Sequence, residues 1–387
     1  MEQKGRASVI IFQESLPDYR IPFLNALGED VDLSVCYSRA TAIKDVTPDL
    51  TKVRSFNAIA LPRKGSSSGF FSWHPELFHH ISRLQPAAII AEPRLGLLTS
   101  WALALRYPYR RRLLWWLSGH EPEENGFSNK LRRWFRRRLY PMAAGYIGYG
   151  SQTREYLRKM GIHKNIHIAT NAADTVGISQ ALTAWENSHN AQEQSRELRQ
   201  GANLVLLFVG RLIPAKRVTM LLQVIALLKS SQPDLSLRLL LVGDGPEKDG
   251  LEALSAELGI ADRVRFCGAI HGPEKLVTWF RASDLFILPG KGGLALNEAI
   301  SFGLPVVLSA ADGTEADMIR DGENGIIVRD ESPEGFANAI NRLAENPELR
   351  EYMGRMSLRT ADERSNLRLM KEGFLMAIHS ILPTENH

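Results

Sequence analysis

One stretch of the second half, SDLFILPGKGGLALNEAISFGLPVV (residues 283–307), decides the fold. An apolar run, Leu285–Leu288, leads into a glycine-rich loop, a short helix pattern follows, and Gly-Leu-Pro precedes a second apolar run. Strands that alternate with helices in this way are typical of parallel sheets in α/β proteins. Backbone N–H groups of the loop Gly290–Gly293 can hold phosphates at the start of the helix. Glu298, one to two turns into that helix, is placed to accept two hydrogen bonds from a ribose diol.

The same alternation extends over the whole chain and predicts two doubly wound α/β domains. Strands are expected in both halves, at 9–13, 31–37, 87–91, 112–117 and 145–149, and at 204–209, 237–242, 264–267, 285–288, 305–309 and 325–328. Helices are expected between them, for instance at 22–27, 76–84 and 97–105. Ligands of such sheets bind beyond the carboxyl ends of the strands, so a cleft between two such domains is the expected active site.

The domain boundaries follow from composition. Residues 173–200 are rich in Ala, Asn, Gln, Ser and Glu and have few large apolar side chains, which predicts a linker with a polar helix. The first domain then covers residues 1–172 and the second covers 201–365. A last helix within residues 366–387 is expected to return to the first domain.

Two further loops of the second half follow apolar strands. In the first, Gly210 is followed by Arg211 and Lys216 before a helix pattern, and basic groups at a helix start favour a diphosphate. The simpler alternative is a solvated basic loop. In the second, Val242-Gly243-Asp244-Gly245-Pro246 predicts a tight turn, which could also line a nucleotide site.

These segments, taken together and in order, resemble the GT4 family of retaining glycosyltransferases. The five matching pieces are Val-Gly-Arg-Leu-x-Pro-x-Lys, Val-Gly-Asp-Gly-Pro, residues 264–268, residues 282–289, and the Glu-Ala-x₃-Gly-x-Pro-Val-Val run from Glu298. The match continues to Asp-Gly-Glu-Asn-Gly at 321–325. Five ordered pieces over about 130 residues are far more specific than one glycine motif. The resemblance implies the GT-B fold, with two Rossmann-like domains facing across a cleft.

The resemblance also assigns roles to single positions. Arg211 and Lys216 would neutralise the diphosphate of a nucleotide-sugar donor, Glu298 would hold its ribose, and the backbone near Ile270 would meet the base. No metal and no cofactor are expected, because the basic pair and the helix N-terminus supply the positive field. The full donor-binding set comprises Gly210, Arg211, Lys216, Gly243, Ile270, Gly290, Lys291, Gly292, Gly293, Leu294, Asn297 and Glu298.

One position departs from the family pattern. The family usually carries a second Glu eight residues before the ribose-binding one, and here that position is Gly290. The missing carboxylate normally touches hydroxyls of the donor sugar, so Lys291 or Asn297 is the nearest substitute. The alternative is that transfer is weakened or lost.

The first half carries fewer signals. Arg20, after the first strand, is a candidate for contact with donor phosphate or acceptor, although a plain helix start at Pro22 explains it equally well. His120 follows the fourth strand, where many family members place a histidine near the reacting sugar, and Glu121 is a weaker candidate beside it. Asn171 stands at the family's hinge between domains and is expected to line the cleft.

Charge is distributed unevenly along the chain. The 25 Lys and Arg against 14 Asp and Glu up to residue 165 leave the first part basic, whereas the overall net charge is only +4. Much of the excess lies in Lys130–Tyr140, a helix pattern with Trp134 and Phe135 that suits an anionic membrane surface. The alternative is a solvated helix whose apolar side chains pack inward. No nucleic acid is expected as partner, since no nucleic-acid-binding fold accompanies the charge.

Bulk properties limit the remaining choices. The 387 residues have 44% hydrophobic and 23% charged residues, only two cysteines, and no apolar run long enough to span a membrane. A cytoplasmic protein is expected, with peripheral attachment at the inner face of a membrane left open. The expected reaction moves a sugar from a nucleoside diphosphate to a hydroxyl acceptor, such as a lipid-linked or cell-envelope glycan. The alternatives are a non-catalytic nucleotide-binding scaffold and a nucleotide-sugar epimerase.

Overall fold

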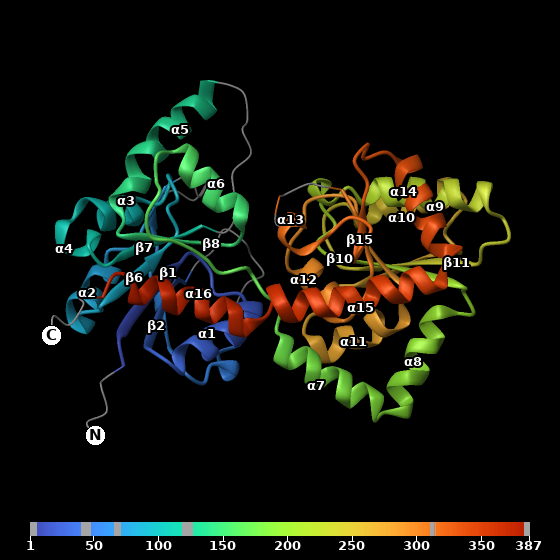
Figure 1. Cartoon of the computed structure of the whole chain (residues 1–387), viewed down its shortest axis with the longest axis horizontal. Coiled ribbons are helices and arrows are strands. Elements are labelled where there is room, and N and C mark those ends of the chain that lie inside the picture. Colours follow the sequence, from blue (N-terminus) through green and yellow to red (C-terminus); the bar gives the residue numbers. More distant parts are fainter. Residues whose placement is uncertain are drawn as a thin grey trace. The chain divides into compact units, whose positions relative to one another are not determined.

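The computed structural model describes residues 6–39, 48–65, 71–117, 127–309, 313 and 315–382, with the backbone alone for 127–129. The chain forms two compact units (Figure 1). Unit 1 runs to Thr170 and takes up the chain again from Leu367, and unit 2 is Asn171–Asn366. Each is described by itself.

Unit 1 is built on a parallel sheet whose order is β3-β2-β1-β6-β7-β8-β9. The strands are β1 (Ser8–Gln13), β2 (Asp32–Ser38), β3 (Asn57–Leu61), β6 (Ala88–Ala91), β7 (Leu113–Leu117), β8 (Gly145–Gly148) and β9 (Ile166–Ile168). A small antiparallel pair, β4 (Lys64–Gly65) and β5 (Ser72–Trp73), lies outside this sheet. The order places the topological switch point between β1 and β6, because the chain proceeds from β1 to β2 on one side and later to β6 on the other.

Helices cover the sheet of unit 1. They are α1 (Ile21–Gly28), α2 (Glu76–Leu84), α3 (Leu98–Leu105), α4 (Tyr107–Arg110), α5 (Phe127–Leu139), α6 (Ser151–Lys159) and α16 (Leu367–His379), with short 3₁₀ turns at Asp18–Arg20, Leu50–Lys52 and Tyr140–Met142. The C-terminal α16 packs on α1, β8 and β9. Its Gly373 lies so close to Ile168 that an added Cβ would sit 2.6 Å from the Ile168 carbonyl oxygen.

Unit 2 has a parallel sheet of order β12-β11-β10-β13-β14-β15. Its strands are β10 (Leu204–Val209), β11 (Leu237–Val242), β12 (Val264–Gly268), β13 (Leu285–Leu288), β14 (Val306–Leu308) and β15 (Gly325–Ile327). All residues of β10, β11 and β13 are buried, as expected for parallel strands covered by helices on both faces. The switch point lies between β10 and β13.

The helices of unit 2 are α7 (Thr175–Glu186), α8 (His189–Arg199), α9 (Val218–Ser231), α10 (Lys248–Glu257), α11 (Pro273–Ala282), α12 (Leu294–Ser301), α13 (Glu315–Met318), α14 (Pro333–Ala344) and α15 (Pro347–Arg364). Helices and strands of unit 2 alternate between β10 and β15, while α7 and α8 precede β10 and α14 and α15 follow β15. A 3₁₀ turn, Pro214–Lys216, precedes α9. The strands expected from the sequence are therefore present in both units, whereas the half-buried β3 and the three-residue β9 were missed because their apolar runs are too short to stand out.

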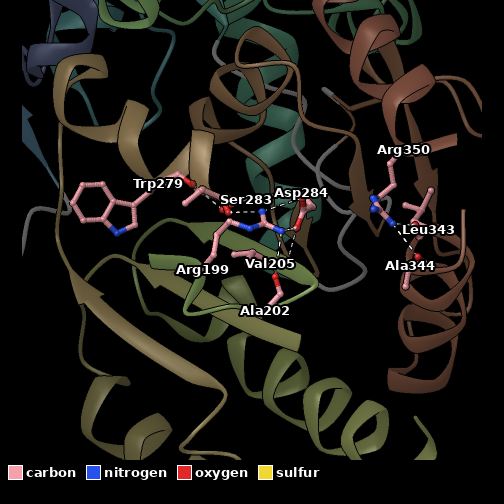
Figure 2. A network of polar contacts seen from close by, with 10 residues as sticks. Arg199, Ala202, Val205, Trp279, Ser283, Asp284, Leu343, Ala344 and Arg350 are labelled. Atoms are coloured by element: carbon pink, nitrogen blue, oxygen red, sulfur yellow. Dashed lines mark hydrogen bonds and ion pairs between the residues drawn. The ribbon is translucent and has the colours of Figure 1, made fainter. Parts of the chain in front are cut away.

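The structure corrects the expectation that residues 173–200 form a linker. These residues form α7 and α8, and both helices pack on α11 inside unit 2. Arg199 of α8 donates to both carboxylate oxygens of Asp284, at 3.1 and 3.0 Å, and to the carbonyl of Ala282 (Figure 2). Asp284 also accepts the backbone N–H of Val205 at 2.7 Å, so the ion pair joins α8 to the starts of β10 and β13. A polar composition thus marks two surface helices with one strong anchor and not a free connection.

No helix in the described residues has both the length and the apolar character needed to cross a membrane.

Candidate functional site

The carboxyl edge of the unit 2 sheet gathers most of the predicted site residues. The loop after β10 carries Gly210, Arg211 and Lys216, and the loop after β13 carries Gly290–Gly293. These two loops leave the sheet on either side of its switch point, where open α/β sheets bind their ligands. Gly243 follows β11 and Ile270 follows β12, so the predicted residues line one edge across four neighbouring strands.

Lys216 joins the two loops at the switch point. Its ammonium donates to the carbonyl oxygens of Lys291 and Gly292, at 2.6 and 2.7 Å. The backbone adds a third link, since Lys291 N–H donates to the carbonyl of Ala215 at 3.0 Å. The Lys216 ammonium therefore fixes the conformation of the glycine loop and places a positive charge next to it. In the described structure the amides of Gly292 and Gly293 have no protein acceptor and remain available to an anion at the start of α12.

Gly290 occupies a position with no room for a side chain. A Cβ there would lie 2.4 Å from the carbonyl oxygen of Ala215 and 2.7 Å from Cα of Lys216. Both neighbours are backbone atoms, which cannot move aside as a flexible side chain would. The structure thus leaves no space for a side chain at position 290, because the loop after β13 lies against the loop after β10 there.

Gly243 shows the same close packing at the next strand. Its φ of +153° is a conformation that side chains rarely adopt, and a Cβ would meet the carbonyl oxygen of Gly210 at 1.8 Å. Gly210 N–H donates to the carbonyl of Val242, and Gly243 N–H donates to the carbonyl of Gly268. Glycines at these strand ends let three loops approach one another, which leaves backbone, and not side chains, at the edge of the sheet.

Glu298 is the carboxylate of this site. It is the fifth residue of α12, it is half-buried, and it has no hydrogen-bond or ion-pair partner among the described residues. Loss of water around it raises the pKa of its carboxyl to about 7. Burial of a carboxyl group without a hydrogen-bond partner costs free energy, and a ligand that donates hydrogen bonds would offset that cost. A vicinal diol can donate two such bonds. Arg211 is exposed, and its side chain forms no hydrogen bond or ion pair within the described part of the chain.

Asn297 has a different role from the one expected. Its amide nitrogen donates to the carbonyl of Asn171 at 2.6 Å, and Ser365 Oγ donates to the same carbonyl at 3.3 Å. Asn171 and Ser365 lie beside the two points where the chain passes from one unit to the other. Asn297 is 2% exposed, and its amide nitrogen ties α12 to the boundary of unit 2, whereas its Oδ1 has no hydrogen-bond partner in the described structure. Lys291 remains exposed in the loop.

Arg20 lies in unit 1 and is already occupied by protein groups. Its guanidinium donates to Gln13 Oε1 and to the hydroxyl of Tyr149, lies 3.8 Å from a carboxylate oxygen of Glu92, and stacks 4.5 Å from the ring centroid of Trp116. Only 12% of its side chain is exposed. Arg20, the candidate for contact with donor phosphate or acceptor, is therefore paired with protein groups at the edge of the sheet, and its contact with a ligand stays a prediction.

Sequence reasoning missed three charged residues beside Arg20. Glu14 follows β1 and Glu92 follows β6, and Phe12 pairs with Ala91 in the two parallel strands, so both carboxylates emerge at the switch point of unit 1. Arg94 forms an ion pair with Glu14, and Ser72 donates to the same carboxylate at 2.8 Å. The available signal was a polar pair after each buried strand, Gln13-Glu14 and Glu92-Pro93-Arg94.

The candidates His120 and Glu121 lie outside the described residues, so the structure does not place them. Among the residues that it does describe, no group of three or more His, Cys, Asp or Glu side chains could hold a metal ion.

The basic helix α5 presents apolar side chains to solvent. Leu131 is 48% and Trp134 is 51% exposed, and the adjoining α3 and α4 expose Leu98, Leu105 and Tyr107 as well. Phe135 contacts the ring of Trp101 on α3, with centroids 6.0 Å apart, and Arg138 lies over Trp134. The alternative, in which Leu131 and Trp134 pack inward, is therefore wrong, whereas Phe135 packs against Trp101.

Comparison with known proteins supports the assignment of unit 2. Residues 190–358 match the family model "Glycosyl transferases group 1". The D-inositol 3-phosphate glycosyltransferase of Streptomyces griseus is 40% identical over 161 residues, which are 39% of this chain and 34% of that protein. The enzyme of the same name from Rhodococcus jostii is 33% identical over 186 residues, 46% of this chain and 40% of the relative. The chain thus spans about a third of the length of the first of these relatives.

Solved structures match the chain over nearly its whole length. The Anabaena HepE complex with UDP superposes with a TM-score of 0.71 at 19% identity and covers 96% of this chain and 99% of that one. WaaG, a glycosyltransferase involved in lipopolysaccharide biosynthesis, gives 0.65 at 18% identity, with 94% and 98% covered. At this identity the likeness concerns the fold alone, and it confirms the GT-B fold class expected from the sequence.

Proposed function

We propose that this chain is a glycosyltransferase that moves a sugar from a nucleoside-diphosphate donor, with uridine as the base, to a hydroxyl acceptor. The observation that carries the proposal is the switch point of unit 2, where Lys216 holds a glycine loop with free amides and Glu298 has a carboxyl without a partner. The local match to D-inositol 3-phosphate glycosyltransferases supports the same reaction class. The base is proposed because HepE is described in complex with UDP and with UDP-glucose.

The residues present are suited to stabilising a leaving diphosphate. The bond from the anomeric carbon to the β-phosphate oxygen breaks, the acceptor oxygen bonds to the same face of that carbon, and the acceptor proton passes to the leaving phosphate. Negative charge grows on the phosphate, and Arg211, Lys216 and the amides at the start of α12 oppose it. Retention of configuration and independence from a metal ion are part of the proposal.

The acceptor is proposed to be a lipid-linked or cell-envelope glycan. The exposed apolar and basic face of α5, with Leu131 and Trp134 among arginines, supports peripheral attachment to an anionic membrane. Such attachment would bring the chain to a lipid-bound acceptor.

Thermal unfolding with UDP, GDP and ADP tests the nucleotide site. A ligand at a hundred times its Kd stabilises the native state by about 2.7 kcal/mol, and for a chain of this size the unfolding temperature rises by a few degrees. We expect UDP to stabilise the wild type and the control Glu252→Ala, whose carboxylate is exposed on α10, and to stabilise Glu298→Ala much less. A response to no nucleotide, or an equal response of Glu298→Ala, would overturn the site.

Turnover separates the alternatives. Release of UDP from UDP-sugars in the presence of an acceptor supports a transferase. Binding of UDP-sugar without release of UDP would instead favour a non-catalytic scaffold. The absence of a side chain at Gly290 is the observation that favours this alternative. Conversion of the donor sugar with no acceptor and no UDP released would favour an epimerase.

A further inference from the structure

The loop that carries Arg211 and Lys216 ends at a residue in a strained backbone conformation. Arg217 has a φ of +54° and a ψ of +36°, the left-handed region, where residues other than glycine are disfavoured about tenfold. It lies between the 3₁₀ turn Pro214–Lys216 and α9, so its dihedral angles set the direction in which the turn leaves the helix. A residue with a side chain keeps such a conformation only where its surroundings enforce it.

The enforcing contact comes from Glu331, a second left-handed residue, two positions before α14. Glu331 has a φ of +49°, and its carboxylate accepts a hydrogen bond from Nη1 of Arg217 at 2.5 Å. Its carbonyl oxygen accepts a second bond, from Nη2 at 3.0 Å, so one guanidinium binds both the side chain and the backbone of Glu331. Nη2 also lies 3.6 Å from the sulfur of Met220 in α9. We call the two bonds between Arg217 and Glu331 the clasp.

We propose that Arg217 is a positioning residue, and that the clasp holds its backbone in the left-handed conformation that directs Lys216 to the glycine loop. The inference rests on the proposed function, in which Lys216 is the cation beside the donor diphosphate. An ion pair whose side chains are 37% and 40% exposed adds little to stability by itself. The clasp therefore acts by selecting one backbone conformation, through two bonds from one planar group.

A change of conformation at Arg217 would be transmitted to the turn before it and not to α9. Val218, the next residue, is fully buried in the core of unit 2 and fixes the start of the helix. Pro214 and Ala215 of the turn are exposed. The turn is therefore the part that moves, and Lys216, its last residue, moves with it.

Lys216 tolerates little movement. Its ammonium reaches two carbonyl oxygens of the glycine loop, at 2.6 and 2.7 Å, and an added Cβ at Gly210 or Gly293 would contact its side chain at 3.8 and 3.7 Å. A displacement of about one ångström would break these bonds, since N–H···O bonds extend to about 3.2 Å. The clasp thus controls the fraction of chains whose donor site is assembled, and the apparent affinity for the donor scales with that fraction.

Titration calorimetry with UDP on the full chain tests the inference. Glu331→Ala removes the carboxylate of the clasp, and Arg217→Ala removes the guanidinium while keeping a side chain at position 217. We expect each to raise the Kd for UDP about tenfold, the factor by which the left-handed conformation is disfavoured. Arg217→Gly removes the clasp together with the need for it, because glycine adopts this conformation freely. Its Kd, and that of the double variant Arg217→Gly/Glu331→Ala, should stay within about twofold of the wild type.

The rescue by glycine is the result that a merely structural ion pair would not produce. The control is Glu363→Ala, which breaks an exposed ion pair with Arg359 on α15 and should leave the Kd unchanged. The unfolding temperature of every variant shows whether it is folded. A wild-type Kd in Glu331→Ala or in Arg217→Ala would overturn the inference. A double variant that binds UDP as weakly as Glu331→Ala would overturn it as well.

Hydrogen exchange separates the clasp from the proposed function. The amide of Lys291 donates to the carbonyl of Ala215 at 3.0 Å, so its exchange reports whether the turn and the glycine loop are joined. We expect this amide to exchange about tenfold faster in Glu331→Ala and at the wild-type rate in the double variant. If the wild type bound no UDP while exchange followed this pattern, the proposed function would fail and the clasp would stand. Unchanged exchange in Glu331→Ala would contradict the clasp itself.

Discussion

The two sheets have their switch points at equivalent positions, but the residues at these two points differ in kind. In unit 2 the edge consists of glycine backbone, a lysine under a loop, an unpartnered Glu298 and an exposed Arg211. In unit 1 the edge is filled by long polar side chains that are paired with one another. Bare backbone amides and an exposed arginine suit a diphosphate, whereas side chains that are paired with one another leave little net charge for an ion. One fold used twice therefore acquires two different switch points from the residues that follow its strands.

The largest expected effect comes from removing the cation of unit 2. Lys216→Met takes away a positive charge and two hydrogen bonds to the loop carbonyls, so we expect sugar transfer to fall about 10²–10³-fold. The control is Lys229→Met: Lys229 also donates to a backbone carbonyl, that of Gly259 at 2.6 Å, but it lies in the last turn of α9, away from the switch point. Initial rates with a UDP-sugar measure both. Equal rates for the two variants would remove Lys216 from the site.

A glutamate at position 290 should lower both the stability of unit 2 and its affinity for UDP. We expect Gly290→Glu to destabilise unit 2 by about 1–3 kcal/mol and to weaken UDP binding, because its Cβ would overlap the backbone at Ala215 and Lys216. Urea denaturation measures the first effect and the UDP-induced shift the second. Gly250→Glu is the matched control, since Gly250 lies in α10 with no atom within 4 Å of an added Cβ. A stable Gly290→Glu with faster transfer would mean that the two loops adapt and that the site is an ordinary member of the family pattern.

The next largest effect concerns the ionisation of Glu298. A rise in pH should lower the stability of the folded chain but raise its affinity for UDP. The pKa of its carboxyl is about 7 in the folded chain against 4.5 as the ordinary value, so the native state keeps a proton that the unfolded state has lost. Stability from this group is present below about pH 4.5 and declines as the pH rises through 7. We expect Glu298→Gln to be more stable than the wild type at pH 8, by about 1–2 kcal/mol, and equal to it near pH 4.

The affinity for UDP should follow the opposite course. Wild-type affinity should increase as the pH rises through 7, because the ionised carboxylate is the stronger acceptor for a ribose diol, and Glu298→Gln should bind more weakly with no such rise. Unfolding curves and UDP titrations at pH 5, 6, 7 and 8, with Glu252→Gln as control, measure both trends. A flat wild-type affinity across that range would separate Glu298 from the ligand.

The loops at the carboxyl edge of the unit 2 sheet could be located from the sequence because they depend on local signals. A buried strand, a glycine loop and a helix start are consecutive in the chain, so Gly290–Gly293 and Glu298 could be placed from spacing alone. The predicted strands of both units were found for the same reason, since fully buried parallel strands are continuous apolar runs. The lack of space for a side chain at Gly290 could not be predicted, because it depends on contact with Ala215, some 75 residues earlier in the chain.

The charged residues at the switch point of unit 1 could not be predicted in the same way. They come from strands that are about 80 positions apart in sequence, and their proximity depends on the pairing of β1 with β6. Residues 173–200 were misinterpreted for another reason: the composition is polar, but one partly buried ion pair, Arg199 with Asp284, anchors α8 to the sheet. Composition reports how much apolar surface a segment offers, and it does not report a single strong contact.

The smallest expected effect concerns the outer helices, where the two units differ again. In α5 six basic residues occur with no acidic one, and Leu131 and Trp134 are exposed, whereas α8 of unit 2 balances two glutamates with two arginines and has no exposed large apolar side chain. Each basic residue near an anionic bilayer contributes about 1 kcal/mol. We therefore expect Arg133→Gln to weaken binding to phosphatidylserine vesicles several-fold, and Trp134→Ala to do so by a similar amount through lost apolar burial.

Vesicle co-sedimentation at low and at physiological salt measures this binding. Arg158→Gln on α6 is the control, because it removes an exposed positive charge from unit 1 outside the α5 face. Salt should weaken wild-type binding, since the attraction of exposed charges is screened within about 8–10 Å. If Arg158→Gln lost as much binding as Arg133→Gln, the interaction would reflect the overall charge of unit 1 and not a docking face. If Trp134→Ala bound as tightly as the wild type, the exposed indole would have no role at the bilayer. The difference between the units would then lie in their switch points alone.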